Sequence, residues 1–171
     1  RPMKRWIVRI SAGLALAGAI ALGNAWLSGE AHQGDTARPA AWQSMTTGTL
    51  RITPPGAEPG AAPQRLGVRI ADDSAERAQG MQHLPARVVR DNPIWFVFPE
   101  PRRVGWHMRN VRTALDIAYV DASGTVIGVE RMTPETSGYG SDAAIAAALE
   151  VAAGQAERLG IAPGTRLELI D

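Results

Sequence analysis

The sequence has no cysteine among its 171 residues. Without cysteine, the chain cannot form disulfides, use a thiol nucleophile, hold an iron–sulfur cluster or bind zinc through thiolates. The absence also excludes a lipoprotein, because lipid attachment behind an export signal needs a cysteine acceptor. It is compatible with an oxidising compartment.

After residue 9 the sequence has little clustered positive charge. The formal net charge is +1, and four of the 18 basic residues are Arg1, Lys4, Arg5 and Arg9. From His32 onward, 14 basic residues stand against 16 acidic ones. A nucleic-acid partner needs a clustered basic face, so the composition disfavours one.

The sequence also lacks motifs that bind nucleotides or metals and motifs that supply an activated nucleophile. The sequence has no Gly-x-Ser-x-Gly elbow, phosphate loop or dinucleotide fingerprint. His83 and His107 are not at a helical metal-ligand spacing with each other or with a carboxylate. We therefore expect no cofactor and no metal.

An export segment opens the chain. Residues 3–9 are basic, and residues 10–22 contain only Ile, Leu, Ala, Gly and one Ser, which is typical of an export signal. Small residues at Gly23 and Ala25, or at Gly29 and Ala31, offer cleavage sites. Uncleaved, residues 10–27 would give an anchor near the shortest that spans a bilayer. Residues 1–31 are thus predicted to be a signal peptide or a membrane anchor.

The basic flank of this segment predicts where the rest of the chain resides. Positive residues precede the apolar run and none directly follows it, which favours a cytoplasmic N-terminus. The remainder is therefore expected outside the cytoplasm, as a periplasmic domain or one anchored to the inner membrane. The N-terminal segment is its only predicted contact with the membrane.

The remainder is predicted to be a short spacer followed by a single domain. Residues 32–45 are polar and small without periodicity, which is typical of a flexible spacer. Residues 46–171 are enough for one hydrophobic core. Residues 53–63 carry four prolines and two glycines, so we expect a loop there.

Hydrophobic periodicity predicts several strands and few helical residues. Asp73 and Glu76 indicate a helix start and Gly80 a helix end, and residues 142–153 fit either helix or strand. A tight turn at residues 121–124 joins the two strands of the clearest predicted hairpin. The predicted strands are 66–70, 94–98 (ended by Pro99 and Pro101), 104–110, 115–120, 125–132 and 166–170; the predicted helices are 74–79 and 155–159.

This pattern predicts the fold class. The helices are too short for parallel crossover connections, so at least five strands should pair mainly antiparallel. We expect an α+β domain, mainly antiparallel β, with two or three short helices.

Four segments of the chain (residues 75–81, 94–98, 106–117 and 149–167) resemble, in this order, the bacterial family named domain of unknown function 192. Residues 75–81 resemble its Glu-Arg-Ala helix followed by Gly-Leu-Met, and residues 94–98 its Met-Leu-Phe-Val-Phe strand. Residues 106–117 are similar to its Phe-Trp-Met-Lys-Asn-Thr and Pro-Leu-Asp-Ile steps, and residues 149–167 to its closing Leu-Glu, Leu-Gly-Ile and Pro-Gly steps. The resemblance runs from about residue 66 to the end. It implies a small barrel-like curled sheet and an exported location, but no activity.

The chain departs from the family pattern at four positions. His107 stands where the family has tryptophan, Val111 where it has threonine, Ala114 where it has proline, and Thr165 where it often has aspartate. A family function that used these groups would not carry over to this chain.

The segment from Trp106 to Asp116 is the candidate functional surface. It concentrates an indole, an imidazole, two guanidinium groups, an amide and a carboxylate within eleven residues. Arginines can bind a carboxylate, phosphate or sulfate by paired hydrogen bonds. The predicted ligand-binding residues are Trp106, Arg109, Asn110 and Asp116. The alternative is an ordinary strand with solvated arginines and Trp106 in the core.

Two classes of function remain open. The first is a non-enzymatic envelope module that binds a small anionic or carbohydrate ligand or a partner protein. The second is a hydrolase-like enzyme that uses Asp116 with His107 or Glu150. The first is favoured because acid–base catalysis needs positioned residues, and His107 departs from the family pattern. The enzyme reading requires these groups to converge in one pocket.

Overall fold

The structure is a computed structural model and describes residues 38–171. The predicted signal peptide or anchor at residues 1–31 lies outside the described residues. Within the described part, no helix is long and apolar enough to cross a membrane.

Seven strands form one sheet in the order β6-β5-β8-β3-β2-β1-β9. Only the β2–β3 pair is parallel, and all other pairs are antiparallel. The strands are β1 (Thr46–Thr53), β2 (Gln64–Ala71), β3 (Ile94–Arg102), β5 (Leu115–Val120), β6 (Val126–Met132), β8 (Ile145–Ala152) and β9 (Arg166–Leu169). The predicted α+β class with mainly antiparallel strands is confirmed.

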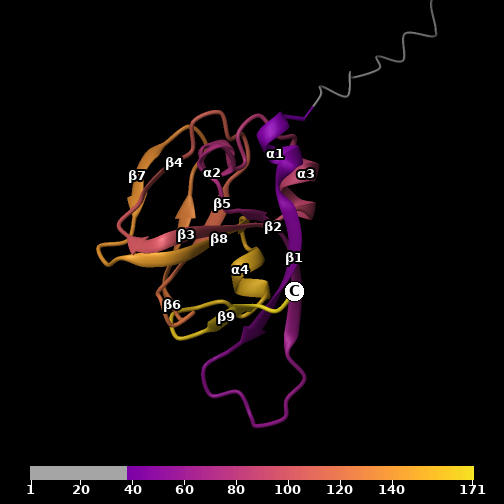
Figure 1. The fold of residues 1–171 in the computed structure, drawn as a ribbon, viewed down its shortest axis with the longest axis vertical. Helices are drawn as coiled ribbons and strands as arrows, with labels where there is room; N and C mark the ends of the chain where they lie inside the picture. Colours follow the sequence, from indigo (N-terminus) through magenta and orange to yellow (C-terminus); the bar gives the residue numbers. More distant parts are fainter. Residues whose placement is uncertain (1–37) are drawn as a thin grey trace, which may run out of the picture. The chain divides into compact units, whose positions relative to one another are not determined.

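The sheet curls strongly into a half-barrel, so its two edge strands approach each other (Figure 1). An isolated bridge joins Thr125, beside β6, to Arg166 of β9. The Val126 amide donates to the Thr165 carbonyl at 2.8 Å, which extends this contact. The right-handed twist that accumulates across neighbouring strands brings the two edges together.

Two short strands and four short helices complete the domain. Strands β4 (Gly105–His107) and β7 (Ser137–Gly140) form a separate two-stranded sheet. The helices are α1 (Ala40–Ser44), α2 (Ser74–Gln79), α3 (Ala86–Asp91) and α4 (Gln155–Arg158). Asp73 caps α2 by accepting a hydrogen bond from the Glu76 amide at 2.8 Å, as the sequence predicts.

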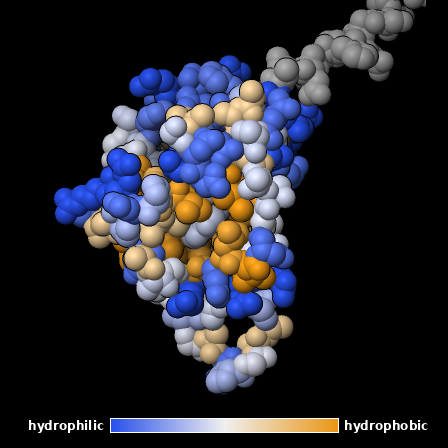
Figure 2. Space-filling model, in the orientation of Figure 1, coloured by the Kyte–Doolittle hydropathy of each residue, from blue (hydrophilic) through white to orange (hydrophobic). Residues whose placement is uncertain are grey.

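Alternating side chains along the strands build a hydrophobic cluster on each face of the sheet. Every strand of the large sheet contributes to the inner cluster, which lies inside the curl and includes Leu50, Val68, Trp95, Ala118, Val126, Leu149 and Leu167. The outer cluster adds residues of α1, α3 and the loops to central strands, and includes Trp42, Met81, Val89, Phe96, Met108, Ile117 and Ala148. Figure 2 shows apolar residues in the middle of one face around α4, surrounded by hydrophilic ones.

Several boundaries differ from the sequence predictions. Strand β3 does not end at the prolines and continues to Arg102. Its pairing with β8 is interrupted between Val97 and Arg102. Pro99 and Pro101 lie in this interruption, where the strand makes no ladder hydrogen bond and the missing proline N–H groups cost nothing. The ambiguous region 142–153 contains strand β8. The alternating segment 104–110 is a strand only at β4, because Asn110 turns the backbone at φ 61°.

Two helices lie where none was expected. Residues 40–44, assigned to the spacer, form α1, and its Trp42 is 1% exposed. The Arg69 guanidinium lies 3.7 Å from the centre of the Trp42 ring, so a cation–π contact fixes the helix to β2. Helix α3 follows Pro85 and buries Val88 and Val89.

Candidate functional site

A concave pocket of about 210 Å³ lies on the outer face of the sheet. Helix α2 and the loop after it form one wall, and the β4 segment forms another. Strands β3 and β8 supply the floor through Phe96 and Glu150. The pocket's lining also includes Arg77, Gly80, Gln82, Phe98, Trp106 and His107.

Aromatic side chains make up much of the pocket around Trp106. The Trp106 ring meets Phe96, Phe98 and Tyr119 edge to face, with centroids 5.8, 6.1 and 6.0 Å away. Such edge-to-face packing stabilises the cluster beyond the burial of its area. Trp106 is half-buried, so its ring is held firmly while it still borders the pocket.

Glu150 is the only carboxyl group in the pocket's lining. It is 5% exposed, and its Oε1 accepts a hydrogen bond from Trp106 Nε1 at 3.0 Å. Its Oε2 is buried and has no hydrogen-bond partner among the described residues. Burial raises the pKa of Glu150 to about 7, although the bond from Trp106 opposes the rise. The side chain can therefore donate or accept a hydrogen bond near neutral pH.

The end of α2 lies next to this free oxygen. Gly80 ends the helix at φ 44°, which favours glycine. A Cβ at Gly80 would lie 3.8 Å from Glu150 Oε2. Gly80 and Glu150 thus lie side by side in the pocket's lining.

Arg77 lies one helical turn before Gly80 and borders the same pocket. Its NH1 donates to the carbonyls of Asp72 and Val97, and its guanidinium lies 5.8 Å from the Phe98 ring centre. The described residues form two ion pairs, Arg51–Glu168 and Arg131–Asp116, and Arg77 belongs to neither. Backbone carbonyls thus position a cation at the pocket.

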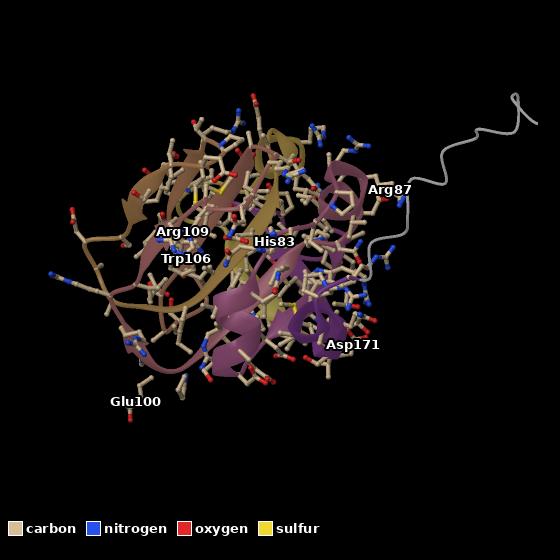
Figure 3. The ribbon with its side chains drawn as sticks, turned by 90° about the horizontal axis from the view of Figure 1, so that it is seen from above. His83, Arg87, Glu100, Trp106, Arg109 and Asp171 are labelled. Carbon is tan, nitrogen blue, oxygen red and sulfur yellow. The ribbon has the colours of Figure 1, made fainter. Side chains whose placement is uncertain are left out.

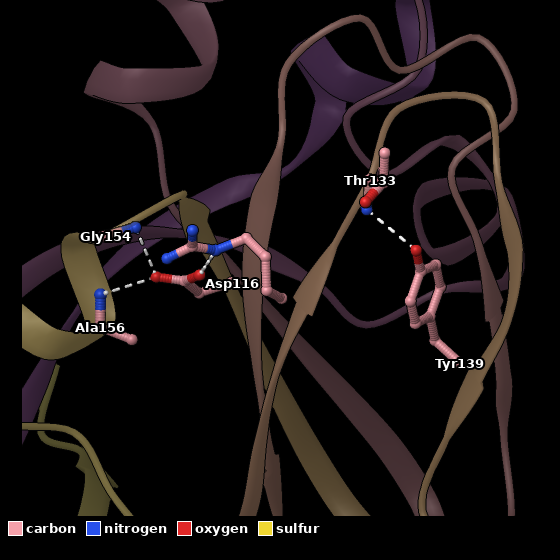
Figure 4. A network of polar contacts seen from close by, with 6 residues as sticks. Asp116, Thr133, Tyr139, Gly154 and Ala156 are labelled. Atoms are coloured by element: carbon pink, nitrogen blue, oxygen red, sulfur yellow. Dashed lines mark hydrogen bonds and ion pairs between the residues drawn. The ribbon is translucent and has the colours of Figure 1, made fainter.

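Asp116 lies on the other face of the sheet, and both of its carboxylate oxygens are hydrogen-bonded to residues of the domain itself (Figure 4). Its Oδ1 accepts a hydrogen bond from Arg131 Nε. Its Oδ2 accepts from the amides of Gly154 at 2.7 Å and Ala156 at 3.4 Å. Asp116 therefore anchors the start of α4 to β5, which is a structural role.

The structure separates the four residues predicted to bind a ligand. Of these, only Trp106 lines the pocket. Arg109 is exposed, and Asn110 turns the chain after β4, where its Nδ2 donates to Gln82 Oε1 at 3.2 Å. Asp116 lines a different depression with Arg131 and α4. Ligand binding by the four residues stays a prediction, but they do not share one pocket.

The three residues of the enzyme hypothesis do not all lie in this pocket. Glu150 and His107 both line the pocket, whereas Asp116 does not. Within residues 38–171, no group of three or more His, Asp or Glu residues could hold a metal ion.

Arg77 and Gly80 were not predicted to be site residues, because their sequence pattern is that of a helix and its end. In the structure they are parts of α2 and its end. A signal was present for Glu150, a charged residue inside the apolar run of β8. A charge within a buried strand calls for a partner or a function.

A family model described as DUF192, an uncharacterized ACR, matches residues 57–169. The chain belongs to the DUF192 family. The resemblance of the sequence is thereby confirmed, and no curated protein matches the chain.

Solved structures share the fold of this DUF192 chain. It is 29% identical to a candidate transcription regulator from Sinorhizobium meliloti 1021, with a TM-score of 0.66 over 74% of this chain and 95% of that one. It is 24% identical to a protein of unknown function from Novosphingobium aromaticivorans DSM 12444, with a TM-score of 0.60 over 70% of this chain and 83% of that one. The second likeness concerns the fold alone.

Proposed function

We propose that this DUF192 domain is a non-enzymatic module that binds a small hydroxyl-bearing ligand of the carbohydrate class in the pocket at Glu150. One observation carries the proposal: Glu150 Oε2 is buried without a partner beside an open pocket. Leaving a buried polar atom unpaired costs about 1–3 kcal/mol. A ligand that hydrogen-bonds this oxygen would recover part of that energy.

The chemistry of the lining favours hydroxyl groups. A hydroxyl both donates and accepts hydrogen bonds, so it matches Glu150 in either protonation state. Trp106 and Phe98 add apolar surface against which the C–H face of a sugar ring can pack. The pocket's volume of about 210 Å³ is below the roughly 300–1,000 Å³ of drug-sized sites, which favours a single ring over a chain.

Binding is favoured over catalysis by the number of acidic groups. The usual mechanisms of glycoside hydrolysis need two carboxyl groups flanking the scissile bond. The lining contains one, Glu150. The observation that keeps a hydrolase as the second candidate is the pKa of Glu150 near 7 with His107 in the same lining, which suits proton transfer.

The Sinorhizobium protein is described as a candidate transcription regulator, and regulation of transcription is therefore a further function to consider for this chain. It would require a basic face for DNA. From His32 onward, however, acidic residues outnumber basic ones, 16 to 14. Small-ligand binding therefore fits the chain better.

Thermal-shift measurements with a panel of monosaccharides test the binding proposal. Purified wild-type protein and the Glu100→Gln control should be stabilised by the same sugar, since Glu100 is exposed at the outer edge of the molecule (Figure 3). Glu150→Leu removes the hydrogen-bonding group and should abolish the shift. A sugar that stabilises all three proteins equally would locate the site elsewhere, and a panel without any binder would contradict the proposal.

We also propose that the domain works outside the cytoplasm, as the basic and apolar residues of 1–31 indicate. Residues 1–45 fused to a reporter active only outside the cytoplasm should give signal. Reporter activity confined to the cytoplasm would refute export. The N-terminal residue of the mature protein distinguishes a cleaved signal from an anchor.

A further inference from the structure

We infer that the ligand of the Glu150 pocket is an acidic monosaccharide, whose anionic group pairs with Arg77 while a hydroxyl bonds Glu150. This inference rests on the proposed function and specifies its substrate class. It starts from the observation that the pocket's lining holds a fixed cation as well as a buried acid.

The guanidinium of Arg77 is prepared for a ligand anion. Its NH1 is held by the carbonyls of Asp72 and Val97, so little side-chain freedom is lost when it binds. Neither of the two ion pairs among residues 38–171 involves it. Arginine binds carboxylates and phosphates through paired, charge-assisted hydrogen bonds.

The spacing along α2 matches one small molecule. Arg77 and Gly80 are three residues apart, so they lie on the same side of the helix, about 5–6 Å apart. Gly80 lies beside Glu150 Oε2, since a Cβ there would be 3.8 Å from that oxygen. Because Arg77, Gly80 and Glu150 all line this one pocket, we place a single ligand between the acid and the cation.

Glu150 and Arg77 together disfavour other classes of ligand. A simple anion would be repelled by the carboxylate form of Glu150 and could not donate a hydrogen bond to it. An amine would be repelled by the positive charge of Arg77. A neutral sugar would satisfy Glu150 and leave Arg77 without a counter-ion. A sugar acid places a hydroxyl and a negative charge on one ring, which satisfies both residues.

Isothermal titration calorimetry on the purified protein tests the inference with glucose, galactose and mannose, each beside its uronate. Wild-type protein should bind at least one uronate about tenfold more tightly than the matched hexose, as expected for a charge-assisted pair. Arg77→Gln should remove that preference, so that the uronate and the matched hexose bind the variant with similar affinity. Arg77→Lys, which keeps the charge but not the planar fork, should retain part of it.

The control is Arg87→Gln, an exposed arginine on α3 that lies away from Trp106 (Figure 3), and it should bind like wild type. If hexoses bind as tightly as uronates and binding still requires Glu150, the acidic-ligand inference fails while the proposed function stands. If uronate preference persists in Arg77→Gln, the inference also fails. If no sugar of either kind binds, both fail.

Discussion

Two acidic residues, Asp116 and Glu150, are buried to nearly the same degree on neighbouring strands, with exposures of 4% and 5%. In the register of β5 and β8, Asp116 lies opposite Val151 and Glu150 lies opposite Ile117. This offset of one residue directs them to opposite faces of the sheet. Asp116 faces the side of the inner cluster and Glu150 the side of the outer one.

Their partners differ much more than their burial. Asp116 has three donors for its two oxygens, whereas Glu150 has one donor and a free oxygen. A buried carboxylate whose oxygens are both hydrogen-bonded is already satisfied within the fold, whereas an unpaired oxygen beside a pocket can still accept a bond from a ligand. Burial alone therefore does not distinguish the two acids, but the count of their partners does.

The largest effect is expected from Asp116→Ala, which tests the structural side of the comparison. The substitution leaves the Gly154 and Ala156 amides without their acceptor and Arg131 without its counter-ion. We expect a loss of about 4 kcal/mol in the free energy of unfolding, because two backbone amides lose their acceptor at about 1–3 kcal/mol each. Denaturant unfolding of both proteins measures the loss, and a change below about 1 kcal/mol would contradict the anchoring role.

Glu150→Gln should have the opposite sign above neutral pH. The folded-state pKa of Glu150 is raised from 4.5 to about 7, so between these values the folded state binds more protons than the unfolded state. Wild-type stability, relative to the variant, therefore falls as pH rises from about 4.5 to about 7 and then levels off. Above pH 7 the variant should be more stable by about 3 kcal/mol.

Denaturant unfolding from pH 4 to pH 9 measures this difference. Glu100→Gln, which replaces an exposed carboxyl group, should show no comparable dependence. A wild type that is as stable as Glu150→Gln at pH 8 would show that the carboxylate is stabilised by contacts beyond the Trp106 bond.

Trp106→Phe should have a smaller effect and sharpen the assignment of that bond. It removes the indole donor of Glu150 Oε1 and keeps an aromatic ring against Phe96 and Phe98. We expect a loss of about 1–2 kcal/mol at neutral pH. Because the bond favours the charged form, its removal should move the pH midpoint of the Glu150 effect upward. An unchanged midpoint would contradict the bond's electrostatic role.

Much of the fold follows from local sequence patterns. The β5–β6 hairpin, the capped helix α2 and the antiparallel class could be predicted from periodicity, from Asp73 and Gly80, and from the short helices. Helix α1 could not, because Trp42 is fixed by Arg69, a contact between distant parts of the chain. The extension of β3 was missed because its prolines are tolerated only where the pairing with β8 is interrupted.

The candidate site was only partly predictable for the same reason. Trp106 was found because it lies in a segment dense in polar and aromatic groups. Glu150 entered only as an alternative partner of Asp116, and strand parity alone did not show that the two acids lie on opposite faces. Arg77 and Gly80 carry the signature of a helix end, and their place in the pocket's lining depends on contacts with β3 and β8 that are distant in sequence.

Arg131→Gln should have the smallest effect and shows which partner holds Asp116. The Arg131 side chain is 55% exposed, and exposed ion pairs contribute little because water and salt screen them. The backbone amides of Gly154 and Ala156 remain in the variant and still satisfy Oδ2. We therefore expect only a small fraction of the Asp116→Ala loss, shrinking further as salt concentration rises. Unfolding midpoints of wild type and variant at low and high salt measure it. A loss equal to that of Asp116→Ala would mean that the guanidinium, and not the start of α4, is the main partner of the buried carboxylate.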